Sequence, residues 1–214
     1  YENLNYFMDM GDRGNMWMYD NIPCDRIINS LGEKAVVSTS MNGPLCVKFT
    51  VDLTMKLPRD YDFAKQVRSD VLIDMPIHVE MTLKKGAKAL EVETTINNTA
   101  KDHYFKVCMP TDLKAEKTWA EGSFMVCEYP VRPSTDGELR GNELARHPAQ
   151  LWYDLADDKN GFAVLLDATK DYEVLEDSDN LTLAMGLVRG TRLRIACDNR
   201  LWMEYPGDES SQSL

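Results

Sequence analysis

Two carboxylates stand close together near the start of the chain, followed by two large aromatic residues. Asp9 and Asp12 are three positions apart, and Trp17 and Tyr19 come next. A pair of carboxyl groups can hydrolyse a glycosidic bond when one acts as nucleophile or base and the other donates a proton. An aromatic ring beside them could stack on a sugar. The alternative is structural, because aspartates also hold turn backbone and a tryptophan also fills a corner of a core.

Other catalytic signatures are missing from the sequence. His78, His103 and His147 are far apart, and none forms the spacing that places two imidazoles on one metal ion, so we predict no metal site here. His147 ends a long loop and is the histidine we take as a functional candidate. The sequence has no Gly-x-Ser-x-Gly nucleophile elbow and no Gly-x-x-x-x-Gly-Lys phosphate loop, which argues against nucleotide hydrolysis.

Charge and cysteine usage narrow the class of protein. The chain has 24 Lys and Arg residues and 35 Asp and Glu residues, which gives a net charge of −11. A negative charge is the wrong sign for binding nucleic acid or an anionic membrane. No run of about 18 apolar residues occurs, so we expect no membrane span. The five cysteines are odd in number and include no Cys-x-x-Cys pair, which favours the reducing cytoplasm over a disulfide framework.

The elements that must position these residues are strands. Apolar residues occupy every second position from Leu45 to Leu57, which is typical of a half-buried strand. The same alternation at Ile77–Leu83 and Leu90–Ile96, around the turn Lys84–Lys88, predicts an antiparallel hairpin. Further predicted strands are Tyr104–Met109, Phe124–Tyr129, Leu151–Leu155, Phe162–Leu166, Tyr172–Leu175, Leu181–Val188 and Arg192–Cys197.

Many short strands without long amphipathic helices predict an all-β fold with few or no helices, a large antiparallel β-sandwich. A barrel is the alternative architecture. The length of 214 residues suits one domain, over 1–206, with a polar tail at 207–214. We expect residues 1–30 to be an irregular segment packed on the sandwich, and we expect long connections at Pro58–Asp70 and Pro130–Pro148. The initial Tyr1 suggests a segment of a longer polypeptide.

Several phrases in order along the chain resemble one enzyme family. They are DMGDRGNMWMY at 9–19, LEVETTINNTAKDH at 90–103, MPT at 109–111, FMVCEYPV at 124–131, HPAQLWYDL at 147–155, Gly161–Val174 and Leu181–Arg189. Together they resemble the C-terminal β-domain of family 38 glycoside hydrolases, the α-mannosidases. The resemblance implies a supersandwich similar to galactose mutarotase.

The resemblance also implies a function that this segment does not perform alone. Enzymes of the family hydrolyse terminal α-mannosides with retention, and their zinc ion, aspartate nucleophile and acid belong to an N-terminal α/β domain. We therefore expect no cofactor and no catalytic residue in this chain, which should be inactive alone. Its expected partners are that catalytic domain, an α-mannoside and a second copy in a homo-oligomer.

The β-domain in such enzymes can lend side chains to the rim of the active site. The resemblance makes seven residues candidates for this rim: Asp9, Asp12, Trp17, Tyr19, Arg146, His147 and Gln150. Asp102 and His103 also match the family, but we expect their role to be structural, closing a turn between two strands and satisfying its amides. Two rival hypotheses stay open, an independent carbohydrate-binding module that stacks sugars on Trp17, Trp119 or Trp152, and a structural or dimerising sandwich.

Overall fold

The computed structural model describes residues 3–15, 19–132, 145–177, 180–195 and 202–204. This part of the chain contains strands and turns and no helix, which confirms the predicted all-β class. It also contains no helix that is long and apolar enough to cross a membrane. All strand pairs in the described residues are antiparallel.

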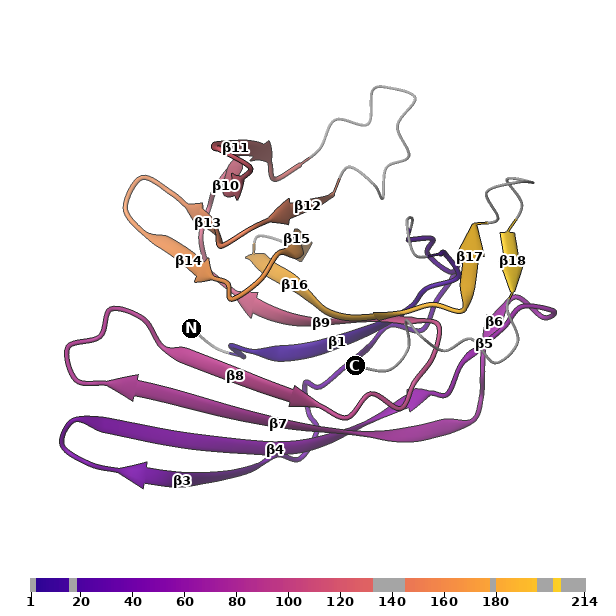
Figure 1. Ribbon diagram of the computed structural model, residues 1–214, viewed down its shortest axis with the longest axis horizontal. Helices are drawn as coiled ribbons and strands as arrows, with labels where there is room; N and C mark the ends of the chain where they lie inside the picture. The colour runs from indigo at the N-terminus through magenta and orange to yellow at the C-terminus, as the bar shows by residue number, and fades with distance from the viewer. Residues whose placement is uncertain (1–2, 16–18, 133–144, 178–179, 196–201, 205–214) are drawn as a thin grey trace.

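Three larger sheets make up the fold (Figure 1). The central sheet has the order β12 (Arg146–Ala149), β15 (Lys170–Asp177), β16 (Asn180–Gly190), β9 (His103–Pro110), β1 (Tyr6–Gly11) and β2 (Ile28–Asn29). The long sheet has the order β3 (Val36–Asn42), β4 (Cys46–Pro58), β7 (Leu72–Lys84) and β8 (Glu91–Ile96). The small sheet has the order β11 (Met125–Pro130), β10 (Lys117–Gly122), β13 (Trp152–Ala156) and β14 (Gly161–Leu165).

Two hydrophobic clusters join the three sheets. In the first, Phe7 and Phe105 of the central sheet pack with Met55 and Met75 of the long sheet. In the second, Leu183 of the central sheet packs with residues of the small sheet, among them Ala120, Tyr153 and Leu155. Met185 contacts both clusters. The central sheet is therefore shared, and burial of apolar surface on it stabilises both halves of the sandwich.

The predicted strands lie where the alternating pattern placed them. β4 and β7 pair over their whole length, from Cys46 opposite Lys84 to Pro58 opposite Leu72. The predicted hairpin forms from β7 and β8, with Ile77 opposite Ile96. In β4 the odd-numbered side chains Met55 and Leu57 are buried and the intervening Lys56 is exposed, as alternation requires. The predicted run Arg192–Cys197 is represented by β17 (Leu193–Ile195), which pairs with β18 (Trp202–Glu204).

The N-terminal segment corrects one expectation. Residues 6–11 are not irregular: they form β1, which lies between β2 and β9 inside the central sheet. The buried positions of this strand are Phe7, Asp9 and Gly11. A buried aspartate and a glycine interrupt the apolar alternation, so the pattern of a strand was hidden in the sequence.

The long connections also contain strands. The Pro58–Asp70 connection holds the two-stranded sheet β5 (Tyr61–Asp62) and β6 (Val67–Arg68). The end of the Pro130–Pro148 connection forms β12, while residues 133–144 are outside the described part of the chain. His147 therefore lies on a strand rather than in a loop.

Candidate functional site

A buried ionic cluster surrounds Asp9. Its Oδ1 lies 2.7 Å from Nδ1 of His103 in β9, and its Oδ2 pairs with the guanidinium of Arg68 in β6. Nε2 of His103 lies 3.0 Å from Oδ1 of Asn98. The side chains of Asp9 and His103 are completely buried, and that of Arg68 is 5% exposed. Charges this far from water persist only when paired, so the cluster fixes β1, β6 and β9 against one another.

Asp12 belongs to a separate network. Its Oδ1 accepts the backbone N–H groups of Gly14 and Asp20, at 2.8 and 3.2 Å, and its Oδ2 lies 2.6 Å from Nε of Arg189. Nη2 of Arg189 also donates to the carbonyl of Asn15, at 2.7 Å. Asp12 thereby ties the end of β1 to the backbone of Gly14 and Asp20. Both oxygens of this buried carboxylate have donors, as a positioning role requires.

Asp102 ties a third pair of segments together. This residue has a left-handed backbone, with φ of 52°, directly before β9. Its carboxylate accepts the backbone N–H of Tyr61 at 3.1 Å and pairs with the guanidinium of Arg192, whose Nε is 3.0 Å from Oδ1. Nη2 of Arg192 donates to the carbonyl of Tyr61 at 2.7 Å. Asp102 thus joins β5 to the chain that follows β16, in keeping with the structural role predicted for it.

Two of the rim candidates, Tyr19 and Arg146, are in contact with each other. The guanidinium carbon of Arg146 lies 3.7 Å from the ring centre of Tyr19 and 4.6 Å from that of Tyr104. Its Nε is 3.6 Å from Oε2 of Glu173, which also pairs with Lys106. Burial raises the pKa of the Tyr19 hydroxyl to about 12, although the charge of Arg146 opposes the shift. Tyr19 is therefore a neutral phenol at physiological pH.

The Tyr19–Arg146 pair keeps unused hydrogen-bonding capacity. Among the described residues, neither the hydroxyl of Tyr19 nor Nε of Arg146 has a hydrogen-bond partner, although both atoms are buried. The pair is joined to Asp12 through Arg189, whose guanidinium carbon is 5.9 Å from the ring centre of Tyr19. Buried polar groups without partners are uncommon in folded proteins.

The remaining rim candidates lie elsewhere. The ring of His147 stacks on Tyr129, with centres 3.7 Å apart and planes 8° apart, and its other neighbour is Tyr172 at 6.0 Å. Gln150 donates from Nε2 to the hydroxyl of Ser123, at 2.8 Å. Trp17 is outside the described residues. The structure therefore brings Tyr19 and Arg146 together and leaves His147 and Gln150 beside the small sheet, where their contact with sugar stays a prediction.

Sequence reasoning missed the cations of this region. Arg68, Arg189 and Arg192 neutralise Asp9, Asp12 and Asp102 across 59, 177 and 90 positions of sequence. No local spacing reports a pair so distant in sequence. The only available signal was Arg189 at the end of a phrase that resembled the family.

The described residues offer no donor set for a metal ion. Within them, no group of three or more His, Cys, Asp and Glu side chains is arranged to hold one. Asp9 Oδ1 lies 2.7 Å from His103 Nδ1, and the other oxygen of Asp9 pairs with the cation of Arg68.

Comparison with known proteins gives the setting of this fold. A curated relative from Halalkalibacterium halodurans, named "Putative mannosylglycerate hydrolase", is 26% identical over 197 residues, which are 86% of this chain and 22% of that protein. An α-mannosidase from Enterococcus faecalis V583 has the same fold, with a TM-score of 0.83 and 24% identity over 99% of this chain and 24% of that one. A structure of a family 38 glycosyl hydrolase from Enterococcus faecalis matches with a TM-score of 0.81 and 23% identity. The match covers 99% of this chain and 25% of that one.

The chain thus spans about a quarter of the length of the proteins it matches. The model of one protein family, described as the glycosyl hydrolases family 38 C-terminal domain, matches residues 2–192, which is nearly all of the chain. This chain belongs to the family of glycosyl hydrolase family 38 C-terminal domains.

Proposed function

We propose that this chain is the C-terminal β-sandwich of a zinc-dependent, retaining α-mannosidase that hydrolyses terminal α-mannosides. Membership of the family 38 C-terminal domains supports this proposal, and so does the likeness to an α-mannosidase of about four times its length. The reaction centre, including the zinc, belongs in this proposal to an N-terminal catalytic domain of the same polypeptide. We place the enzyme in the cytoplasm, on the cysteine usage of the sequence.

The observation that carries the proposal is the pair Tyr19–Arg146. The Arg146 guanidinium lies against both phenol rings, which are tilted 54° to each other, and its Nε is 3.6 Å from Glu173. Nε makes no hydrogen bond within the described residues. Hydroxyl and guanidinium donors of this kind bind sugar hydroxyls or the carboxylates of a neighbouring domain. In the proposed enzyme these two side chains complete the rim of the mannose site.

The buried ion pairs and hydrogen bonds hold Tyr19 and Arg146 in position for that role. Asp12, paired with Arg189, accepts the backbone N–H of Asp20 next to Tyr19, and Glu173 and Tyr104 contact Arg146. A binding group must stay within a few tenths of an ångström of its place to favour a transition state, and buried ion pairs provide that rigidity. Asp9 and Asp12 are in this account positioning residues.

The experiment that tests the proposal uses the intact polypeptide that carries this chain. The expected result is hydrolysis of 4-nitrophenyl α-mannoside, with α-mannose as the first product by ¹H NMR and loss of activity on removal of zinc. The α-glucoside is the control substrate and should not be hydrolysed. First formation of β-mannose, or full activity of metal-free protein whose metal content is verified, would overturn the mechanism proposed.

A further inference from the structure

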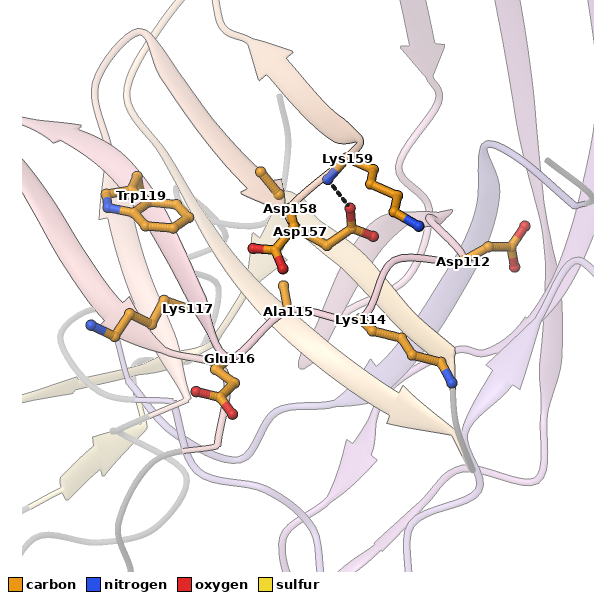
Figure 2. Close-up of a pocket in the computed structure, with 10 residues that line it drawn as sticks. Asp112, Lys114, Ala115, Glu116, Lys117, Trp119, Asp157, Asp158 and Lys159 are labelled. Carbon is orange, nitrogen blue, oxygen red and sulfur yellow. Dashed lines mark hydrogen bonds between the residues drawn. The ribbon is translucent and has the colours of Figure 1, made fainter.

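An open hollow lies at one end of the outward face of the small sheet, and neither Tyr19 nor Arg146 lines it. Its volume is about 730 Å³, enough for a sugar ring with its hydroxyl groups. Figure 2 shows Trp119 and Lys117 of β10 on one side, with Asp157, Asp158 and Lys159 of the β13–β14 turn on another. The β9–β10 connection, with Glu116, completes the wall.

The strand period explains why Trp119 faces the hollow. Its neighbours Thr118 and Ala120 are buried, so they point into the core, and Trp119 between them must point outward. The indole is half-buried. Large aromatic side chains usually have most of their surface covered, and this one stands over an open space on the outside of a sheet.

The polar lining suits a neutral, hydroxyl-rich ligand. The hollow has four carboxylates and three lysines, so acceptors and donors are mixed and nearly balanced in charge. A sugar hydroxyl both donates and accepts, and it can therefore use both kinds of group. A phosphate or another strong anion would meet more negative than positive charge here.

Two of the residues that line the hollow are small. Ala115 and Ala156 line the same hollow, and neither side chain reaches beyond its Cβ. Across the sheet, Trp119 pairs with Asp154, whose Oδ1 is buried and has no hydrogen-bond partner among the described residues. The C–H face of a pyranose ring is apolar and slightly positive, and it complements the negative face of the indole.

We propose that this hollow is a second carbohydrate site, which binds a neutral pyranoside ring stacked on Trp119. The carboxylate of Glu116 and the ammonium group of Lys159 bind its hydroxyls. Asp157 Oδ1 already accepts two backbone N–H groups of its turn, and Lys117 Nζ pairs with Glu128 at 2.6 Å. This site is separate from the mannose rim in the proposed function, and it holds whether or not that function is correct. In an intact glycosidase it would retain a further sugar of the same glycan.

The test is a titration of this chain with methyl α-D-mannopyranoside, followed by ¹⁵N–¹H NMR. The four tryptophans give four indole signals, which single Trp→Phe variants assign. The expected result is a saturable shift of the Trp119 indole and of the backbone amides of Asp158 and Lys159. Trp119→Ala should weaken binding at least about tenfold, a loss of about 1.4 kcal/mol.

Matched variants keep the test specific. Phe124 is a fully exposed aromatic residue at the tip of the same sheet, outside the hollow, and Phe124→Asn should leave the affinity unchanged. Arg146→Ala should also leave it unchanged, which separates this site from the rim. Methyl β-D-glucuronide should bind more weakly than the neutral sugar. The proposal is overturned by saturable binding that survives Trp119→Ala, by tighter binding of the glucuronide, or by no shift at Trp119 in a folded sample.

Discussion

Asp9 and His103 form a fully buried carboxylate–imidazole pair, with 2.7 Å between Oδ1 and Nδ1, although 94 positions separate them in the sequence. The pair lies where β1 and β9 run side by side, and Arg68 closes it from the β5–β6 sheet. The same contact occurs at the surface, where Asp52 Oδ1 lies 2.7 Å from His78 Nδ1. The chain thus contains a buried and an exposed version of one interaction.

We predict that Asp9→Ala destabilises the fold by about 3 to 5 kcal/mol, because the buried Arg68 would lose its nearer carboxylate and keep only Asp25, at 3.8 Å. Asp52→Ala is the matched control, since its carboxylate is 57% exposed, and it should cost less than about 1 kcal/mol. Urea unfolding of both variants measures the two values. Equal losses of unfolding free energy in the two variants would show that burial does not determine how much these pairs stabilise the fold.

The network of Asp12 predicts a local change in hydrogen exchange. Arg189→Lys keeps the charge but loses the planar guanidinium that binds Asp12 and the carbonyl of Asn15 together. The backbone amides of Gly14 and Asp20, which donate to Asp12, should then exchange faster. Amides in β7, on the long sheet, are the internal control. Unchanged protection at Gly14 and Asp20 would contradict the positioning role of Arg189.

A side chain at Gly186 in β16 would clash with its neighbours, so we predict a loss of stability on substitution. A Cβ at Gly186 would lie 2.4 Å from Oδ1 of Asp171 and 2.6 Å from the hydroxyl of Tyr104, which are hydrogen-bonded to each other. Gly186→Ala should therefore cost about 1 to 3 kcal/mol in thermal or urea unfolding. Gly161→Ala, whose nearest contact would be Ala156 at 3.4 Å, should change stability by about 0.5 kcal/mol or less. A neutral Gly186→Ala would show that the Tyr104–Asp171 pair moves freely.

The strands that the sequence revealed are those with one fully apolar face. β4 and β7 alternate without interruption, and both lie as expected. The sequence did not predict β1, because Asp9 takes a buried position in it. It did not predict β10, because the inward residues of that strand are Thr118 and Ala120. β3 has no buried face at all, so no period could mark it. Prediction by pattern fails where polar or small residues are buried.

The site was harder to predict than the fold. Asp9, Asp12 and Tyr19 were candidates by residue type and spacing, and the resemblance to a family placed them and Arg146 at a rim. The sequence did not reveal that the two aspartates are buried. Their partners Arg68 and Arg189 become neighbours only when distant strands pair. Tertiary pairing of this kind leaves no period and no spacing to detect.

The environment of His147 predicts a dependence of stability on pH. Burial lowers the pKa of this imidazole below its ordinary value of 6.5, so the unfolded chain binds the proton more readily than the folded chain. This residue should therefore destabilise the fold as pH falls below about 6.5, and His147→Phe should remove that contribution while keeping the stack on Tyr129.

The measurement is the difference in unfolding free energy between the wild type and His147→Phe at pH 7.5 and pH 5. The difference should move in favour of the variant at the lower pH. An NMR titration of His147 with a midpoint above 6.5 would contradict this account.

The most direct test of the proposed function is the kinetics of rim variants in the intact polypeptide, with 4-nitrophenyl α-mannoside as substrate. Arg146→Lys and Tyr19→Phe should each lower kcat/KM at least about tenfold while the unfolding midpoint stays near that of the wild type. Arg132→Lys is the control, since Arg132 is 68% exposed and pairs with Glu176 at the surface. Wild-type kcat/KM in both rim variants would contradict a role for this domain at the mannose site.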